Sequence, residues 1–496
     1  MTSADWGPTL EDLAIRHREA EAMGGPERLA RHHDAGKLDA RARVEALLDS
    51  DSFFEIGRLV GDVPADGVIT GWGQIEGRSV VVVAEDFTTA AGSIGRGSHI
   101  KRIRAADLAL QESIPLIMLL EGAGYRPGEV GHGGKSPVDL NLQAKCSGEV
   151  PLITGVLGAS AGHGALVAPM SDFTVMTSRA AVFTAGPPVV RESMGQEISK
   201  EDLGGPSVAL SSGLIHNLAE DDSDALLQIR TYLSFFPSSA WTYPPSQPGA
   251  EGPEPPIEDL LTVIPRDGRR GYDMRKVIEL IVDDGYWFEV QPQYGKAVIT
   301  ALARIGGHPV AIVANQPQVM AGSVDADAAD KAAHFITVAD SFHLPLIFLS
   351  DNPGILPGRK SEMDGVLRSG ARMYAAQAQA TTVKINITMR KAYGFGSMVM
   401  AMASFERQSG IFGFPGATLG AMGAAAMSRA TGAGDEAARQ LRRIEEEASY
   451  NSAKWLGFDE LIDPRDTRRV LLTVLRHSLN RRQKPPAPVL RKAITP

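Results

Sequence analysis

The stretch VITGWGQIEGRSVVVVAEDF, residues 68–87, recurs as VITALARIGGHPVAIVANQP at residues 298–317. The offset between the copies is 230 (298 − 68), and it continues without a gap from Pro115-Leu116-Ile117 to Pro345-Leu346-Ile347. A repeat of this length at constant spacing predicts that the chain contains two copies of one folding unit.

Each copy has the pattern of a strand, a Gly-bearing loop, an amphipathic helix and a second, buried strand. The expected ranges are strands at 79–84 and 310–314, helices at 99–111 and 328–341, and buried strands at 115–120 and 345–350. The apolar runs LIMLL and LIFL suit parallel strands that helices cover on both faces. We therefore predict an α/β fold with two homologous β-β-α domains in tandem.

A Pro-rich segment, residues 237–256, separates the two copies. Its composition cannot sustain a helix or a central strand, so we interpret it as the linker between domains at 8–250 and 251–487. Two charged helical patterns lie outside the repeat, at 11–48 and 435–450. We expect both to form packing or oligomer surfaces.

The composition excludes several classes of protein. The chain has 496 residues, 43% hydrophobic and 22% charged, which is typical of a globular enzyme. Its net charge of −9 argues against nucleic-acid binding. We expect no signal peptide and no membrane span, because the apolar runs are too short. The lone Cys146 excludes an internal disulfide and fits a cytoplasmic setting.

Beyond the first repeat block, the strand at 152–156 aligns with 385–389 at an offset of 233. This alignment brings GASAGHGA (158–165) next to KAYGFGSM (391–398), and each stretch stands between a strand and a helix. Backbone N–H groups at such a helix start can form an oxyanion hole. A single Gly-rich turn is more often structural, but the duplication favours two oxyanion holes.

The first Gly-rich turn also fits a rival function. Gly158 to Gly162 match G-x-S-x-G, so Ser160 could be the nucleophile of a serine hydrolase. The equivalent residue in the second copy is then Tyr393, which makes this the minor hypothesis. His163 is a possible acid–base group, or it only fills the pocket wall. The histidines show no metal-ligand spacing, so we predict no metal site.

The chain resembles the carboxyltransferase (β) subunits of biotin-dependent acyl-CoA carboxylases, the propionyl-CoA and methylcrotonyl-CoA carboxylase group. The stretches that carry this resemblance are GKLDARARVEALLDSDSFFE (36–55), DFTVMTSRAAVFTAGPPVV (172–190), EDLGG (201–205), DNPGILPG (351–358), RKAYGFGS (390–397) and DPRDTRR (463–469). The resemblance implies a crotonase-like (ClpP/crotonase superfamily) fold for both domains and covers nearly the whole chain.

The resemblance implies carboxyl transfer from carboxybiotin to an acyl-CoA. Carboxybiotin, carried on a partner domain, would enter between two protomers and lose CO2, and the thioester enolate would capture it. The N–H groups of Gly162 and His163 would hold the thioester oxygen, and those of Phe395 and Gly396 the ureido oxygen of biotin. The expected partner is a biotin carboxylase and biotin carboxyl carrier subunit, and the expected assembly is a homo-hexamer.

Substrate binding is expected at a few further positions. Gly124 and Arg126 lie where the family usually has SGGARIQEG, and this chain departs from that pattern over Gly122–Glu129 and in HGGKS at 132–136. Ala161 and Met398 would line the acyl pocket, although Met residues at this spacing are more often core.

A basic helix face could meet the CoA phosphate, or it is only a solvated surface; its residues would be Lys101, Arg102 and Arg104. Three other functions remain open: a biotin-dependent acyl-CoA decarboxylase subunit, the serine hydrolase, and a non-catalytic structural paralogue, which the departures at Tyr125, His163 and Phe395 would suit.

Overall fold

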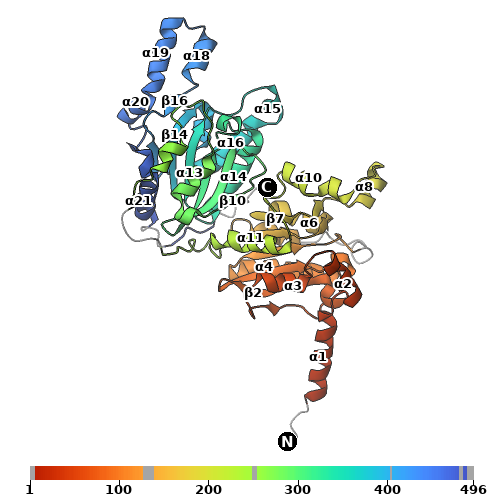
Figure 1. Cartoon of the computed structure of the whole chain (residues 1–496). Helices are drawn as coiled ribbons and strands as arrows, with labels where there is room; N and C mark the ends of the chain where they lie inside the picture. Colours follow the sequence, from red (N-terminus) through yellow and green to blue (C-terminus); the bar gives the residue numbers. More distant parts are fainter. Residues whose placement is uncertain (1–5, 127–138, 249–253, 403–404, 480–483, 489–496) are drawn as a thin grey trace. The chain divides into compact units, whose positions relative to one another are not determined.

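The computed structural model describes residues 6–126, 139–248, 254–402, 405–479 and 484–488. The described chain divides into two compact units, which meet in sequence between Leu233 and Ser234. Figure 1 shows that each unit is built on its own β-sheet, with helices packed against it. The predicted fold class, two α/β domains in tandem, is confirmed.

The first unit has a seven-stranded sheet in the order β1-β2-β3-β4-β5-β7-β9. Its first three strands are antiparallel, and β3 to β9 are parallel. The strands are β1 Phe54–Glu55, β2 Val68–Ile75, β3 Arg78–Glu85, β4 Leu116–Leu120, β5 Leu152–Val156, β7 Phe173–Thr177 and β9 Asn217–Ala219, and the short strands β6 Ala159–Ala161 and β8 Ala181–Phe183 pair with each other.

The second unit repeats this topology in the order β10-β11-β12-β13-β14-β15-β17, with β16 paired to β14. The antiparallel start and the parallel remainder are also the same. The strands are β10 Trp287–Val290, β11 Val298–Ile305, β12 His308–Asn315, β13 Leu346–Asn352, β14 Lys384–Tyr393, β15 Gly410–Gly413, β16 Thr418–Gly420 and β17 Glu460–Leu461.

Helices bury the apolar faces of both sheets. The first unit contains α1 Gly7–Glu21, α2 Pro26–Asp34, α3 Ala40–Leu47, α4 Arg96–Glu112, α5 Asp139–Cys146, α6 Gly162–Ala165, α7 Val167–Met170, α8 Pro187–Met194, α9 Lys200–Gly204, α10 Pro206–Ser211 and α11 Asp222–Ser234. The second contains α12 Asp259–Val263, α13 Met274–Ile281, α14 Ala326–Ser341, α15 Arg359–Met363, α16 Val366–Gln379, α17 Gly394–Val399, α18 Ala424–Thr431, α19 Asp435–Glu446, α20 Ala448–Lys454 and α21 Thr467–Leu479.

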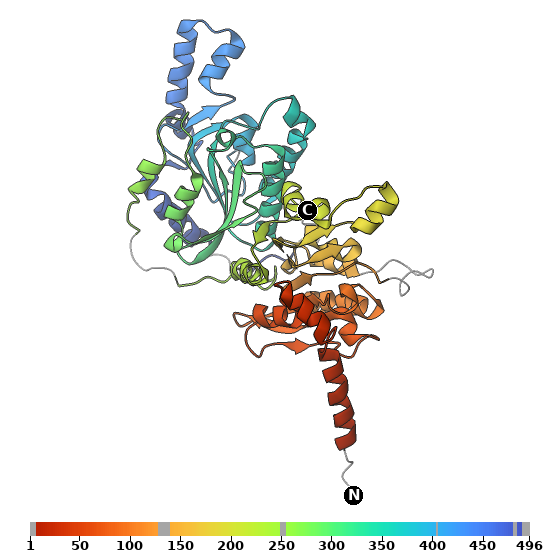
Figure 2. The ribbon, with the colours of Figure 1, turned by 45° about the vertical axis from the view of Figure 1, so that its right-hand side comes forward.

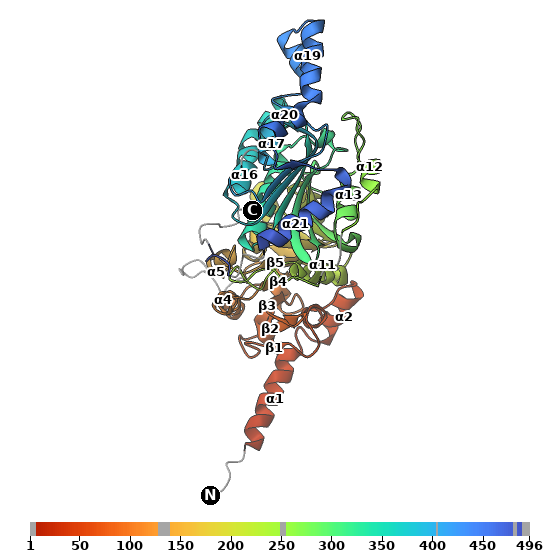
Figure 3. The same ribbon diagram turned by 90° about the vertical axis from the view of Figure 1, so that its left-hand side faces the viewer.

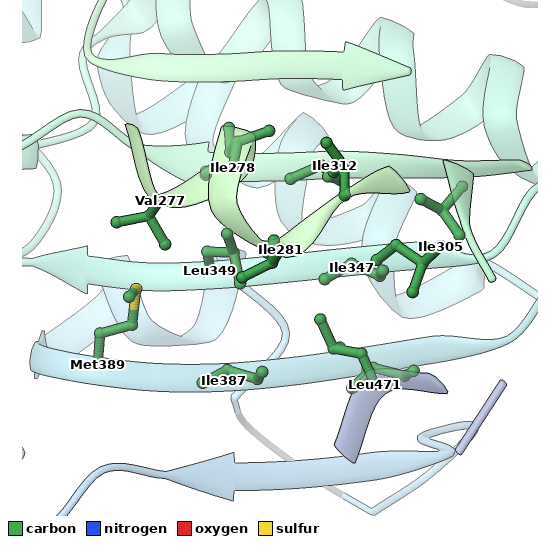
Figure 4. Packing of buried hydrophobic residues seen from close by; sticks show 14 of the residues in the cluster. Val277, Ile278, Ile281, Ile305, Ile312, Ile347, Leu349, Ile387, Met389 and Leu471 are labelled. Carbon is green, nitrogen blue, oxygen red and sulfur yellow. The ribbon is translucent and has the colours of Figure 1, made fainter. Parts of the chain in front are cut away.

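The core of the second unit shows why its strands are apolar along their whole length. Figure 3 shows α13 and α21 on one face of the sheet. Ile278 and Ile281 of α13 and Leu471 of α21 are buried there against Ile312 and Ile347 of the sheet (Figure 4). Helices α14 and α16 pack against each other, and α14 also contacts β11 and β12. Figure 2 shows the α18–α19 hairpin extending away from this core.

The strand pairing confirms the first offset and corrects the second. Val81 lies opposite Leu116 in the first unit and Ala311 opposite Leu346 in the second, which is the predicted offset of 230. Leu116 then pairs with Leu152, whereas Leu346 pairs with Lys384, so the second offset is 232 (384 − 152). The predicted offset of 233 was wrong, because apolar residues follow one another in both strands and hide a slip of one residue.

The interpretation of residues 237–256 as a linker was partly wrong. The described part, up to residue 248, has no helix or strand, as its prolines predict. Its start nevertheless packs in the second unit, where His343 Nε2 lies 2.7 Å from the carbonyl oxygen of Ala240. Phe236, which directly precedes the segment, is buried and contacts Phe342 edge to face.

Candidate active site

In each unit, a glycine with a left-handed backbone begins the helix that follows the Gly-rich stretch. Gly162 (φ 62°) begins α6, and Gly394 (φ 52°) begins α17. These two residues are equivalent at the offset of 232. The same offset makes His163 equivalent to Phe395, and Gly164 equivalent to Gly396. At this offset, the predicted donor pair Gly162/His163 corresponds to Gly394/Phe395. It therefore shares only the position of Phe395 with the other predicted pair, Phe395/Gly396.

The backbone N–H groups at both helix starts are available to a ligand. The first residues of a helix have no intrahelical acceptor. The described residues form no hydrogen bond with the N–H groups of Gly162, His163, Gly394 or Phe395. A helix start also carries partial positive charge, so both positions suit an oxyanion.

A second loop approaches each helix start closely. In the first unit, a Cβ on Gly124 would lie 3.2 Å from the carbonyl oxygen of Ala161. In the second, a Cβ on Gly396 would lie only 2.5 Å from the Cα of Gly354. The loop carbonyls are held in the same way, because Gly124 accepts from the Ile94 N–H and Gly354 from the Val324 N–H. The two helix starts thus share one backbone arrangement.

A buried ionic cluster lies beside the first helix start. His163 Nε2 lies 2.6 Å from Oδ1 of Asp139, and Arg102 donates from Nε to Asp139 Oδ2 at 2.9 Å. The other arm of Arg102 donates to Glu85 at 2.9 Å. Burial raises the pKa of Glu85. Burial would also raise the pKa of Asp139, but the hydrogen bond from His163 and the charge of Arg102 outweigh it and hold that pKa well below its usual range.

The second helix start has a different surrounding. Phe395 replaces the histidine and packs near Tyr374 of α16, with 6.0 Å between the ring centroids. The buried carboxylate at the end of β13, Asp351, accepts from Arg390 Nε at 2.7 Å and lies 3.6 Å from Lys391 Nζ. Burial lowers the pKa of Lys391. This cluster contains two basic groups for one carboxylate.

Comparison with known proteins places this geometry in a family. Residues 31–492 match the carboxyl transferase domain. The chain belongs to the carboxyl transferase domain family. It is 36% identical to the methylmalonyl-CoA carboxyltransferase 12S subunit of Propionibacterium freudenreichii subsp. shermanii, over 96% of this chain and 95% of that protein. It is 34% identical to the methylmalonyl-CoA decarboxylase subunit alpha of Veillonella parvula, over 96% of each.

A solved structure confirms the fold of this family member. The transcarboxylase 12S structure, a hexamer described with methylmalonyl-coenzyme A and methylmalonic acid bound, matches with a TM-score of 0.90 and 34% identity over 98% of each chain. The crotonase-like fold and the carboxyltransferase assignment predicted from the sequence are thereby confirmed.

The predicted basic face on α4 was wrong. Lys101 is buried and donates to the carbonyl oxygens of Ala65 and Val68. Burial lowers its pKa to about 8. Arg102 is fully buried in the ionic cluster, and only Arg104 of the three basic residues is exposed. The residue pattern of the helix alone does not reveal that Lys101 is buried. The face that carries Lys101 is covered by β2 and β3 and by the segment that leads into β2.

The other predicted binding residues have varied settings. Arg126 donates to Asp66 Oδ1 at 2.6 Å and to the carbonyl oxygen of Ser93, so it braces the loop that carries Gly124. Ala161 is the residue before α6, and Met398, in α17, is 38% exposed. Most of the unusual stretch at 122–136, from residue 127 onward, lies outside the described residues.

Ser160 does not have the setting of a hydrolase nucleophile. It lies in β6 rather than at the strand-to-helix turn, and it is not among the residues with positive φ. Its hydroxyl is buried and has no hydrogen-bond partner among the described residues, so His163 does not activate it. The G-x-S-x-G match therefore reflects the close packing of small residues: a Cβ on Gly158 would lie 2.2 Å from Glu121.

Sequence reasoning missed the acidic residues of both clusters. Glu85 ends the apolar run VVVVAE, and Asp351 ends LIFLSD. Glu121, a buried residue that pairs with Arg43 outside these clusters, ends LIMLLE in the same way. A carboxylate directly after a buried parallel strand is the signal that could have found them, since ligands bind at that end of the sheet. Asp139 has no such signal, because it comes from a separate helix.

The described residues contain no helix long and apolar enough to cross a membrane. They also contain no group of three or more His, Cys, Asp or Glu side chains placed to hold a metal ion.

Proposed function

We propose that this chain moves a carboxyl group between biotin, carried on a partner biotin carboxyl carrier, and the α-carbon of an acyl-CoA. The observation that carries the proposal is the duplicated helix start, Gly162 and Gly394, each with left-handed backbone and N–H groups that have no acceptor among the described residues. Carboxyl transfer passes through two oxyanions, the enolates of biotin and of the thioester. Two matched oxyanion sites suit this chemistry.

The residue roles follow the register of the two units. The N–H groups of Gly162 and His163 hold the thioester oxygen, with Gly124 and Ala161 in the adjoining wall. The N–H groups around Phe395, those of Gly394 and Gly396 included, hold the ureido oxygen of biotin, and Met398 borders the acyl group. Proton transfer needs no side-chain base here, because the biotin enolate itself can take the α-proton of the acyl-CoA.

The similarity to a 12S hexamer supports a hexameric assembly, and the similarity to methylmalonyl-CoA enzymes supports a short, branched acyl group. The setting we propose is the cytoplasm, with a biotin carboxylase subunit as partner. A decarboxylase subunit is the second candidate, because the Veillonella parvula decarboxylase subunit is about as similar as the carboxyltransferases. The same half-reaction serves both, and the partner decides the direction.

The test is carboxyl transfer between free biotin and a panel of short, branched and long malonyl-type CoA esters, catalysed by the intact chain. We expect transfer with at least one ester. Silence across the panel, with the protein folded and assembled, would favour the structural paralogue.

Backbone donors need a special set of variants. Gly162→Ala and Gly394→Ala force an L residue into the left-handed region and displace the donors, so each should lower the transfer rate by at least about tenfold. Gly77→Ala is the matched control: it has φ 72°, nothing within 4 Å of its Cβ, and a place in the β2–β3 turn at the opposite end of the strands. An equal loss in Gly77→Ala would contradict the oxyanion roles. Because the oxyanions form only during the reaction, both losses should appear mainly in kcat rather than in KM.

A further inference from the structure

The surroundings of His163 fix which of its ring nitrogens faces Asp139. Asp139 is fully buried, and its depressed pKa keeps it ionised, so its oxygens only accept hydrogen bonds. Nε2 of His163, 2.6 Å away, must therefore carry a hydrogen and donate it. The remaining nitrogen, Nδ1, has no partner among the described residues. Protonation of this imidazole occurs at Nδ1.

The cluster behind His163 is short of positive charge. Two carboxylates, Glu85 and Asp139, share the single guanidinium of Arg102. The raised pKa of Glu85 agrees with this shortage, since burial of the carboxylate is not fully offset by Arg102. With a neutral imidazole and both carboxylates ionised, the net charge of the cluster is −1. A protonated imidazole makes the cluster neutral.

The other polar groups facing the imidazole do not supply this charge. His99 of α4 lies 3.5 Å from Asp139, and burial lowers its pKa. The ring of Tyr125 lies 4.9 Å from that of His163, and burial, with the nearby Asp139, raises its pKa to about 12, so it remains a neutral hydroxyl. Among the described groups around Asp139, His163 is thus the one that belongs to the helix start itself, and a second proton on its ring would supply this charge.

We propose that His163 is a catalytic residue of this enzyme: its imidazolium, anchored on Asp139, supplies the positive charge that lets the first helix start hold an oxyanion. The proposal rests on the function proposed above. Binding an anionic oxygen at this site is coupled to uptake of one proton at Nδ1. The second helix start, with Phe395 beside it and two basic groups around Asp351, has no such coupling.

The test measures protons rather than turnover. Two unreactive CoA thioethers serve as probes: carboxymethyl-CoA, whose carboxylate stands in for the enolate oxygen, and ethyl-CoA, which is neutral. Calorimetry in buffers of different ionisation enthalpy counts the protons taken up on binding. In alkaline buffers, the intact protein should take up close to one proton with carboxymethyl-CoA and none with ethyl-CoA. The affinity for the carboxylate should then fall by up to tenfold per pH unit.

The variants assign the proton to its residue. His163→Gln and His163→Phe, the latter copying the second unit, should lose both the uptake and the pH slope while still binding ethyl-CoA. His99→Gln should retain both. Uptake that persists in His163→Gln, or that disappears in His99→Gln, would overturn the assignment. Equal, pH-independent binding of both probes would overturn the coupling, whereas failure to bind either CoA probe would overturn the proposed function and this inference with it.

Discussion

The two units share a backbone plan but differ in the charges around it. Lys101 and Lys331 occupy the same repeat position, and both are buried with their ammonium groups on backbone carbonyls. The next residue along is Arg102 in the first unit and Ala332 in the second. The carboxylate that Arg102 pairs with, Glu85, is replaced by the neutral Asn315.

We expect the features that both units retain to serve both proposed ligands, and the charged residues found in one unit to serve only one ligand. On the proposed function, the glycines and helix starts, which present N–H groups, are retained in both units because either enolate would be an oxyanion. The ionic partners differ because the two proposed ligands are different molecules. The comparison therefore predicts that changes to backbone geometry damage either unit, whereas changes to charge act only in the first.

The largest effect is expected from Arg102→Ala. This change gives the first unit the residue of the second, but it leaves Glu85 and Asp139 buried without their guanidinium. Removal of one partner from a buried ion pair costs about 3–5 kcal/mol. Denaturant unfolding should show a loss of this size for the first unit.

The companion change Glu85→Asn provides the control for this prediction. It copies Asn315, so the double variant removes one carboxylate together with the guanidinium. The double variant should be more stable than Arg102→Ala alone. If it is less stable, the charge on Glu85 is not the cause of the loss.

The next effect concerns equivalent glycines, Gly164 and Gly396. A Cβ at 396 would lie 2.2 Å from Asn352 Oδ1 and 2.5 Å from the Cα of Gly354, so the loop must shift. A Cβ at 164 would meet its nearest atom, Glu85 Oε1, at 3.2 Å. Gly396→Ala should therefore lower carboxyl transfer by roughly 100-fold, the cost of a displacement of about 1 Å at a reacting centre.

Gly164→Ala is the matched variant and should retain most of the transfer activity in the same assay. Equal losses in the two variants would mean that close packing does not distinguish the two helix starts.

The sequence predicted the parts of this comparison that repeat. Both β-loop-α-β units, the Gly-rich stretches at 158–165 and 391–398 and the offset of 230 follow from periodicity and glycine spacing. The ionic clusters were not predictable, because Asp139, Arg102 and Glu85 come from three different elements. Nor was the register at the second Gly-rich turn, since runs of small and apolar residues align almost equally well at offsets of 232 and 233.

A smaller effect is expected from a hydrogen bond that the second unit makes and that Ala161 of the first unit cannot make. Tyr393, directly before α17, donates to Glu445 of α19 at 2.5 Å, and Glu445 also accepts from the Ala424 N–H. The equivalent residue in the first unit is Ala161. Tyr393→Phe removes one hydrogen bond to a charged group, worth about 1.5–3 kcal/mol.

Because this bond ties the α18–α19 hairpin to the second helix start, hydrogen exchange should accelerate in α18 and α19. Exchange in the core strand β4 of the first unit is the internal control and should not change. Equal acceleration in β4 would indicate global destabilisation rather than release of the hairpin.

A last difference between the units concerns Asp172, which occupies the place of Ser409: their N–H groups donate to the equivalent carbonyls of Leu152 and Lys384. Burial raises the pKa of Asp172 from its ordinary 3.8 to about 8. The folded chain therefore keeps a proton that the unfolded chain releases, so this contribution to stability is complete below pH 3.8 and is lost as the pH rises to about 8. Asp172→Asn should lose less thermal stability between pH 5 and pH 8 than the unmodified protein does. An unchanged pH slope would mean that Asp172 is already ionised in the folded chain, so that burial does not hold a proton at this position.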